Sequence, residues 1–226
     1  MREIVLDTET TGLNYRAGDR IIEVGCVELI NHVSTGKTLQ FYCFVEKEID
    51  EAAQKVHGLT NSFLKKHPSF DEQANKFLNF IGKDDLIIHN AEFDLGFINN
   101  ELKIIGKNKL TNKVIDTVTL ARKKLNTRIA NLDYLCRRFS IDLSERSLHG
   151  ALLDSQLLAE VYLELRGGKQ ISMNLQQINE EKEGVSQTKP GKKLIFQKVI
   201  PNEEEKTNHK NSMKQIKNSI WEKINY

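Results

Sequence analysis

The chain has 226 residues, 39% of them hydrophobic and 28% charged, with 33 Lys and Arg against 31 Asp and Glu. This length suits one domain of roughly 150 to 200 residues plus a short appendage, and the composition excludes a disordered or fibrous protein. Charge interrupts the apolar residues at the start, and no later apolar run could span a bilayer. We therefore expect a cytoplasmic protein without a membrane partner.

The predicted elements begin with strands. Residues 4–7, 20–30 and 38–45 are rich in Val, Ile, Leu and aromatic side chains and are separated by Gly and Asn turns, which predicts an antiparallel start. Helical patterns follow at 51–56 and 70–81, then a buried strand at 86–88, a helix at 92–105, a strand at 114–116 and further helices up to residue 165. Strands that alternate with helices indicate an α/β domain with a mixed sheet flanked by helices.

A change of composition after Gly167 and Gly168 predicts where the domain ends. The apolar periodicity stops there, and a stretch rich in Lys, Gln, Asn and Glu begins. Residues 169–226 hold 11 Lys and 7 Glu, which leaves 22 basic and 24 acidic residues in 1–168. We predict a slightly acidic domain at 1–168, a linker at 169–193 and a C-terminal tail at 194–226.

Two carboxylates stand at the end of the first predicted strand. Asp7 and Glu9 lie two residues apart, so strand alternation places both side chains on one face, about 6.6 Å apart along the backbone. Such a pair could bind metal ions. The alternative is a solvated strand end before the turn at Thr10, Thr11 and Gly12, and spacing alone does not exclude it.

A third acid, Asp94, falls on the apolar side of a predicted helix. At about 100° per residue it lies within the arc of the apolar residues Phe93, Phe97, Ile98, Leu102 and Ile105. Asn90 is expected to cap this helix by accepting a backbone N–H with its side chain. Glu101 lies close to the same line, so a polar helix edge remains a structural alternative.

A fourth acid, Asp154, lies on the centre line of the apolar stripe Leu157, Leu158, Val161, Tyr162 and Leu165. Burying an unpaired carboxylate is costly unless a cation or hydrogen bonds compensate it. A salt bridge could do so, but no cationic residue is evident on the same faces, which favours a divalent metal ion. Oxygen ligands alone suit Mg²⁺ or Mn²⁺ rather than zinc.

His149 precedes the same helix, five residues before Asp154. An imidazole titrates near neutral pH, so a histidine beside a metal site can serve as a general base. A surface or capping histidine is the alternative. Asp116, before Thr117, is predicted to be a helix cap rather than a metal ligand.

Three stretches closely resemble the three motifs of the DEDDh exonucleases: Asp7-Thr8-Glu9-Thr10-Thr11-Gly12, His89-Asn90-Ala91-Glu92-Phe93-Asp94 and His149-Gly150-Ala151-Leu152-Leu153-Asp154. The resemblance covers residues 1 to about 168 and implies a ribonuclease H-like fold, with a five-stranded mixed sheet and the metal site at its edge. It also implies two divalent metal ions, Mg²⁺ or Mn²⁺, held by Asp7, Glu9, Asp94 and Asp154, with His149 as the catalytic base.

Other stretches, such as 22–25, 56–59, 120–123 and 159–163, resemble the epsilon-type proofreading subunits of bacterial DNA polymerase III. By that resemblance the chain would hydrolyse a DNA 3′ end, with His57 contacting the terminal nucleotide and Phe93 packing near the frayed bases. The implied substrate-binding residues are Asp7, Glu9, His57, Phe93 and Asp154.

Two tail segments suggest protein partners. Residues 170–175 resemble a short motif that docks on the sliding clamp, with Gln170, Met173 and Leu175 as anchors; an ordinary linker start is an equal alternative. Pro201 to Glu205, His209 and Trp221 resemble the epsilon tail that binds the polymerase catalytic (alpha) subunit, and Leu194 and Trp221 are the expected contacts in the tail at 194–226. Its apolar residues Met213, Ile216, Ile220 and Ile224 recur at spacings of three and four. A disordered solubilising tail is the alternative.

Two rival functions share the same fold. A free-standing DEDDh nuclease acting on RNA or short oligonucleotides would have every catalytic residue, and only the tail argues against it. A non-catalytic binding module normally lacks metal ligands, whereas all four acids and His149 are present here.

Overall fold

The computed structural model describes residues 1–144, 146, 148–168 and 202–214. The chain divides into two units, Met1–Met173 and Asn174–Tyr226, each described by itself. The predicted linker at 169–193 and most of the predicted tail lie outside the described residues, so those boundaries stay predictions.

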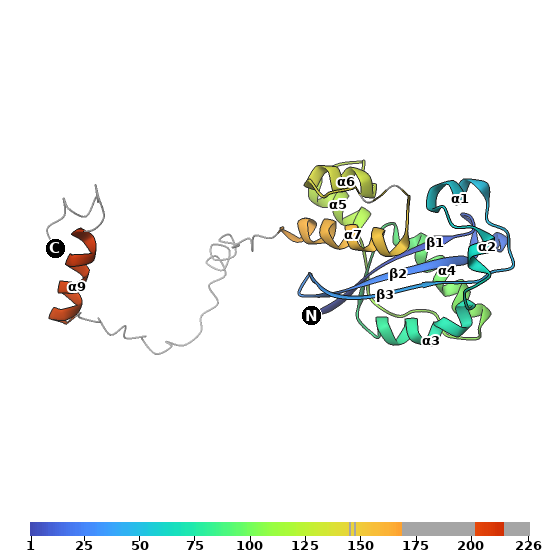
Figure 1. Cartoon of the computed structure of the whole chain (residues 1–226), viewed down its shortest axis with the longest axis horizontal. Coiled ribbons are helices and arrows are strands. Elements are labelled where there is room, and N and C mark those ends of the chain that lie inside the picture. Colours follow the sequence, from blue (N-terminus) through green and yellow to red (C-terminus); the bar gives the residue numbers. More distant parts are fainter. Residues whose placement is uncertain (145, 147, 169–201, 215–226) are drawn as a thin grey trace, which may run out of the picture. The chain divides into compact units, whose positions relative to one another are not determined.

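Five strands form one mixed sheet in the order β3-β2-β1-β4-β5 (Figure 1). They are β1 (Arg2–Thr10), β2 (Ile21–Ile30), β3 (Val33–Tyr42), β4 (Asp85–Ile88) and β5 (Val114–Asp116). β2 pairs antiparallel with β1 and β3, whereas β4 pairs parallel with β1 and β5. The predicted mixed sheet with an antiparallel start is confirmed.

The third strand differs from its predicted bounds of 38–45. It begins at Val33 because Asn31 and His32 both have positive φ angles, 51° and 70°, and make a two-residue hairpin turn after Ile30. Such turns match the twist of the paired strands. Beyond Tyr42 the chain leaves the sheet, and Cys43 and Val45 are buried in the core instead of continuing the strand.

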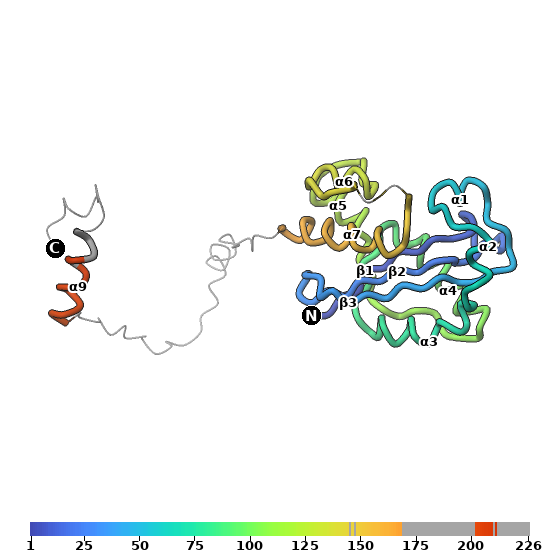
Figure 2. The backbone as a smooth tube through the Cα atoms, viewed as in Figure 1, coloured from blue at the N-terminus to red at the C-terminus, as the bar shows by residue number. Residues whose placement is uncertain are grey.

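Helices cover both faces of the sheet. On one face lie α3 (Phe70–Ile81) and α4 (Ala91–Ile104), and on the other lie α5 (Thr117–Leu125), α6 (Leu132–Phe139) and α7 (Ala151–Arg166). Ile4 and Leu6 pack in the first core and Val5 in the second, which is why β1 has an uninterrupted apolar run. Figure 2 shows α7, in orange, lying against the blue N-terminal strands. The two ends of the domain sequence are therefore packed together.

Three short elements complete the domain: η1 (Tyr15–Ala17), α1 (Glu51–His57) and α2 (Asn61–Leu64). Ile22, Val45, Ile49 and Leu64 form a small core of their own next to α1 and α2. In the second unit, α9 (Glu203–Lys214) has exposed side chains from Glu203 to His209. Among the described residues no helix is long and apolar enough to cross a membrane.

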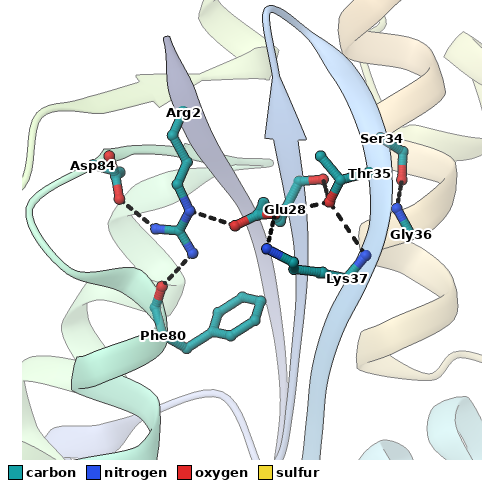
Figure 3. Close-up of polar contacts among 8 residues, drawn as sticks. All are labelled: Arg2, Glu28, Ser34, Thr35, Gly36, Lys37, Phe80 and Asp84. Atoms are coloured by element: carbon teal, nitrogen blue, oxygen red, sulfur yellow. Dashed lines mark hydrogen bonds and ion pairs between the residues drawn. The ribbon is translucent and has the colours of Figure 1, made fainter.

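Arg2 joins three parts of the domain at the start of β1 (Figure 3). Its guanidinium donates to the carboxylates of Glu28 and Asp84, and Nη2 donates to the carbonyl oxygen of Phe80 at 2.8 Å. Glu28 is buried and also accepts from the Thr35 hydroxyl at 2.9 Å. The network ties β1, β2 and β3 to the segment that leads into β4.

Arg2→Ala should lower the free energy of unfolding by roughly 1 to 3 kcal/mol, because buried Glu28 and the Phe80 carbonyl lose a charged donor. Lys37→Ala is the matched control: Lys37 is 74% exposed and lies 3.4 Å from the same carboxylate, so we expect a loss below about 0.5 kcal/mol. Urea denaturation measures both. Equal losses would show that the Arg2 contacts do not stabilise the sheet.

Candidate active site

The end of β1 supplies carboxylates to one face of the sheet and a hydroxyl to the other. Asp7 and Glu9 share the face of Val5, which packs with α7, and their partners across β2 are Gly25 and Glu23. Thr8 points to the opposite face, where its Oγ1 donates to Asp94 Oδ1 at 2.7 Å. The end of β1 therefore brings together acids from two separate sequence motifs, Asp7 and Glu9 from the first and Asp94 from the second.

Asp94 lies in the first turn of α4 and is 2% exposed, as the apolar arc predicted. Asn90 stands at the predicted N-cap position of α4, but the predicted side-chain cap is wrong, because Asn90 has a left-handed backbone (φ 63°) and its side chain makes no capping hydrogen bond. Its own N–H donates to Asp116 Oδ1 at 3.2 Å. Asp116 is confirmed as a cap: it accepts from the backbone N–H of Val118 at 2.8 Å at the start of α5.

Asp154 is placed by the direct contact of α7 with β2. A Cβ at Gly25 would lie 2.2 Å from the carbonyl carbon of Ala151, so only glycine allows this approach. Ser155 Oγ donates to the Gly25 carbonyl oxygen at 3.0 Å. The tight packing sets Asp154, 5% exposed, above the face that carries Asp7.

Glu23 is a site residue that the sequence reasoning missed. It is 2% exposed, and its carboxylate accepts from the backbone N–H groups of Ala151 and Leu152 and from Gln40 Nε2 at 2.8 Å. Gly150 offers no side chain to cap α7, so β2 supplies the cap from outside the helix. The signal was a glutamate inside the apolar strand sequence Ile21–Ile30, but nothing in one sequence links it to α7.

Arg146 corrects the expectation that no cation faces these acids. Its Nε and Nη2 donate to the two carboxylate oxygens of Asp154 at 2.6 and 2.7 Å, and Nη1 donates to Asp133. Arg146 lies outside any helix or strand, so sequence periodicity assigns its side chain to no face. Within the described part of the chain, a salt bridge therefore compensates Asp154, and none is formed by Asp7, Glu9 or Asp94.

His149 borders the same cluster. Its backbone N–H donates to the Val56 carbonyl oxygen at 3.0 Å, and its Nδ1 lies 3.2 Å from Asp154 Oδ2 and 3.0 Å from Arg146 Nη2. Ligand atoms of Glu9, His149 and Asp154 lie within 4.8 Å of one another. A pocket of about 290 Å³ opens here, lined by Asp7, His89, Asn131, Leu132, Asp133, Arg146, His149, Asp154 and Leu158.

The carboxylates repel one another. Burial, and then the charges of Asp94, Glu9 and Asp154, raise the pKa of Asp7 well above its usual range. Burial and Asp154 raise the pKa of Glu9 to about 8, and burial raises that of Asp94 to about 7. Burial also opposes ionisation of Asp154, but its hydrogen bonds with Arg146 and His149 lower its pKa. An oxygen-rich site of this charge fits hard divalent cations such as Mg²⁺ or Mn²⁺.

Glu101 shows what a structural acid looks like in this fold. It is 1% exposed, like Asp94, but Arg20 donates to both of its oxygens at 2.7 Å. It also accepts the backbone N–H of Ile21 at 3.2 Å. Glu101 therefore has a structural role. Asp94 differs, because among the described residues its side-chain hydrogen-bond partner is a hydroxyl, that of Thr8, and not a cation.

The two predicted substrate contacts outside the acid cluster, His57 and Phe93, belong to α1 and α4. His57 is 5% exposed and ends α1; its Nδ1 accepts from the Leu59 N–H at 3.0 Å. Its Nε2 is the one buried side-chain polar atom without a hydrogen-bond partner within the described part of the chain. Phe93 is partly buried against Phe97, with ring centroids 4.9 Å apart. Gln170, Met173, Leu175, Leu194 and Trp221 lie outside the described residues.

The chain is similar to exonucleases and to polymerase subunits. The family described as Exonuclease matches residues 4–162. The DNA polymerase III subunit epsilon of Rickettsia felis is 40% identical over 222 residues, 96% of this chain and 97% of that protein. Its counterpart in Escherichia coli (strain K12) is 44% identical over 176 residues, 74% of this chain and 72% of that protein.

Exonuclease X in complex with 5′ overhanging duplex DNA has the same fold, with a TM-score of 0.57 and 21% identity over 72% of this chain and 90% of that chain. The expected ribonuclease H-like fold is confirmed.

The metal-free protein should become less stable as pH rises. Glu9 and Asp94 have raised pKa values, about 8 and about 7, so the folded state holds their protons more tightly than the unfolded state does. That stability is complete below the unfolded pKa, roughly 4, and is lost as pH rises through about 8. The carboxylates with lowered pKa values stay ionised over this range, and the lowered pKa values of His57 and His89 contribute a smaller change in the opposite direction.

Melting temperatures in EDTA should therefore fall between pH 5.5 and 8.5, and Mn²⁺ should restore stability at pH 8.5. Asp7→Asn removes one of the repelling charges, so it should flatten the fall. A melting temperature that is constant across this range in EDTA would show that the acids do not repel as described.

Proposed function

Because this chain belongs to the exonuclease family, we propose that it is the proofreading 3′-to-5′ exonuclease subunit of a bacterial DNA polymerase III. The observation that carries the proposal is the convergence of Asp7, Glu9, Asp94, Asp154 and His149 at the end of β1, the central strand of the sheet. The match to a DNA polymerase III subunit epsilon over 96% of this chain and 97% of that protein supports the role of the whole chain. A protein with this role would act in the bacterial cytoplasm.

The donor set suggests how the ions are held. Asp7 would contact both ions, Glu9 and Asp154 would hold the ion on the side of the attacking water, and Asp94 would hold the other. When bound, the two ions supply positive charge to the phosphodiester and to the leaving oxygen. The mutual repulsion of Asp7, Glu9 and Asp94 supports this assignment, because only added positive charge relieves it.

His149 is the proposed general base. Its side chain is 44% exposed beside Glu9 and Asp154, so water and substrate can reach it. His149 would take a proton from the attacking water. A new bond from the water oxygen to phosphorus would then replace the bond to the 3′ oxygen, and that oxygen would take up a proton from solvent. The products are a nucleoside 5′-monophosphate and a shortened 3′-hydroxyl end.

His57 is proposed to contact the terminal nucleotide. With Nδ1 accepting the Leu59 N–H, the neutral ring carries its proton on the buried Nε2, which would donate to a substrate oxygen once the bound nucleotide reaches it. Burial, with the nearby charge of His149, lowers the pKa of His57 and favours that neutral form. Phe93 would offer an aromatic face to a frayed base.

The charge balance supports a subunit rather than an independent nuclease. Residues 1–168 carry 22 basic and 24 acidic side chains, whereas independent DNA binders need a basic surface to replace counterions. A polymerase that holds the DNA removes this need. We propose that residues 194–226, through Leu194 and Trp221, bind the polymerase catalytic (alpha) subunit. Gln170, Met173 and Leu175 are proposed to dock on the sliding clamp.

His149→Ala should lower the exonuclease rate about 10²- to 10⁴-fold, the usual contribution of a general base. His67→Ala, at a histidine that packs on Tyr42 and Phe63 outside the site, is the matched control and should retain activity. The assay compares 3′-mismatched DNA, 3′-paired DNA and single-stranded RNA in Mg²⁺, with EDTA as a blank.

Faster removal of the mismatch, abolished by EDTA, is the expected result. Preferential digestion of RNA would instead indicate a free-standing nuclease. An unchanged rate in a folded His149→Ala protein would contradict the assignment of the base.

His57→Ala should lower kcat/KM on DNA about tenfold, mainly through KM, because a contact with the bound nucleotide is removed while the acids are untouched. Steady-state kinetics on a short 3′ single strand, with Mn²⁺ binding measured in parallel, separates the two effects. Unchanged kinetics would rule out the contact, and weakened Mn²⁺ binding would assign His57 to the metal site instead.

A further inference from the structure

Arg146 forms hydrogen bonds to both carboxylate oxygens of Asp154, a residue that the proposed mechanism uses as a metal ligand. We propose that Arg146 is a resident counter-ion for Asp154, which the divalent cation displaces when the site is loaded. Asp133 retains the guanidinium after the exchange. The inference rests on the proposed function, because it takes Asp154 to be a metal ligand.

The contact with Asp154 uses both of its oxygens. Nε and Nη2 of Arg146 form two parallel hydrogen bonds, 2.6 and 2.7 Å long, to Oδ1 and Oδ2. The side chains of Arg146 and Asp154 are only 7% and 6% exposed, so solvent screens the pair weakly. A paired fork of this kind is among the strongest side-chain contacts and defines the orientation of the carboxylate.

A metal ion and the guanidinium compete for the same charge. Asp154 brings one negative charge, and both oxygens already accept from Arg146. A divalent cation bound there would lie within a few ångströms of a buried positive group, where repulsion is strong. The same guanidinium also reaches His149, 3.0 Å from Nη2 to Nδ1, so it occupies the proposed base as well.

A second carboxylate gives the displaced guanidinium a place to stay. Nη1 of Arg146 already donates to Asp133 on α6, whose side chain is 44% exposed. Asp133 has room for more than one cation, since Arg137 Nη2 approaches its other oxygen at 4.0 Å. Arg146 can therefore release Asp154 and His149 without becoming a buried unpaired charge.

The competing explanation is a fixed salt bridge that merely orients Asp154. The two explanations predict opposite effects of removing Arg146 on metal affinity. If Arg146 orients the ligand, its removal weakens metal binding. If it competes with the metal, its removal strengthens binding while the metal-free protein loses stability. Asp133 separates the two explanations again, because the exchange needs Asp133 as the remaining partner of Arg146 after Asp154 has been released.

The experiment is a Mn²⁺ titration of the full chain in which EPR measures the free ion, with melting temperatures recorded in EDTA. Arg146→Gln should bind Mn²⁺ about tenfold more tightly than the unaltered chain, and it should melt at a lower temperature in EDTA. Arg137→Gln, an exposed arginine that shares Asp133, is the matched control and should change neither.

Asp133→Asn should weaken Mn²⁺ binding a few-fold, since the displaced guanidinium loses its partner, and it keeps the test valid if Arg146→Gln does not fold. In the double variant the Asp133 effect should vanish. Unchanged or weaker Mn²⁺ binding by Arg146→Gln, or an Asp133→Asn variant that binds like the unaltered chain, would overturn the exchange. Loss of Mn²⁺ binding in the unaltered chain would overturn the proposed function instead.

Discussion

Repulsion among the carboxylates at the end of β1 is the constraint around which the domain is organised. Asp7, Glu9 and Asp94 meet where burial weakens solvation, and all three hold their protons more tightly than free acids do. A fold can keep such a cluster only if the surrounding structure is stable enough to offset it. The apolar cores on both faces of the sheet provide that stability, and bound cations would remove the repulsion itself.

The contacts around the cluster make its geometry rigid. Thr8 links β1 to Asp94 on α4, while Gly25 and Glu23 on β2 hold the start of α7 and therefore Asp154. These contacts place acids from two faces of the sheet at one strand end. A rigid arrangement matters for catalysis, because ligands that need not reorganise give their full stabilisation to the transition state.

Charge compensation is uneven across the site. Asp154 has a guanidinium partner in Arg146, and Glu101 farther along α4 has one in Arg20. Among the described residues, Asp7, Glu9 and Asp94 form no salt bridge with a cationic side chain. The difference between Glu101, with its fixed partner, and Asp94, with only a hydroxyl, separates structural acids from candidate metal ligands more sharply than burial does, since both side chains are buried alike.

The sequence by itself determined the elements and the chemistry. Apolar alternation and helical periodicity predicted the mixed sheet and its helices, and the acids at 7, 9, 94 and 154 stood out because carboxylates rarely occupy apolar faces. Only the tertiary structure decided which groups compensate them. The capping of α7 by Glu23, the contact of Gly25 with Ala151 and the pairing of Arg146 with Asp154 each join distant or irregular segments. Local periodicity has no information about such contacts, because it describes one element at a time, whereas charge and close packing depend on what the folded chain brings next to it.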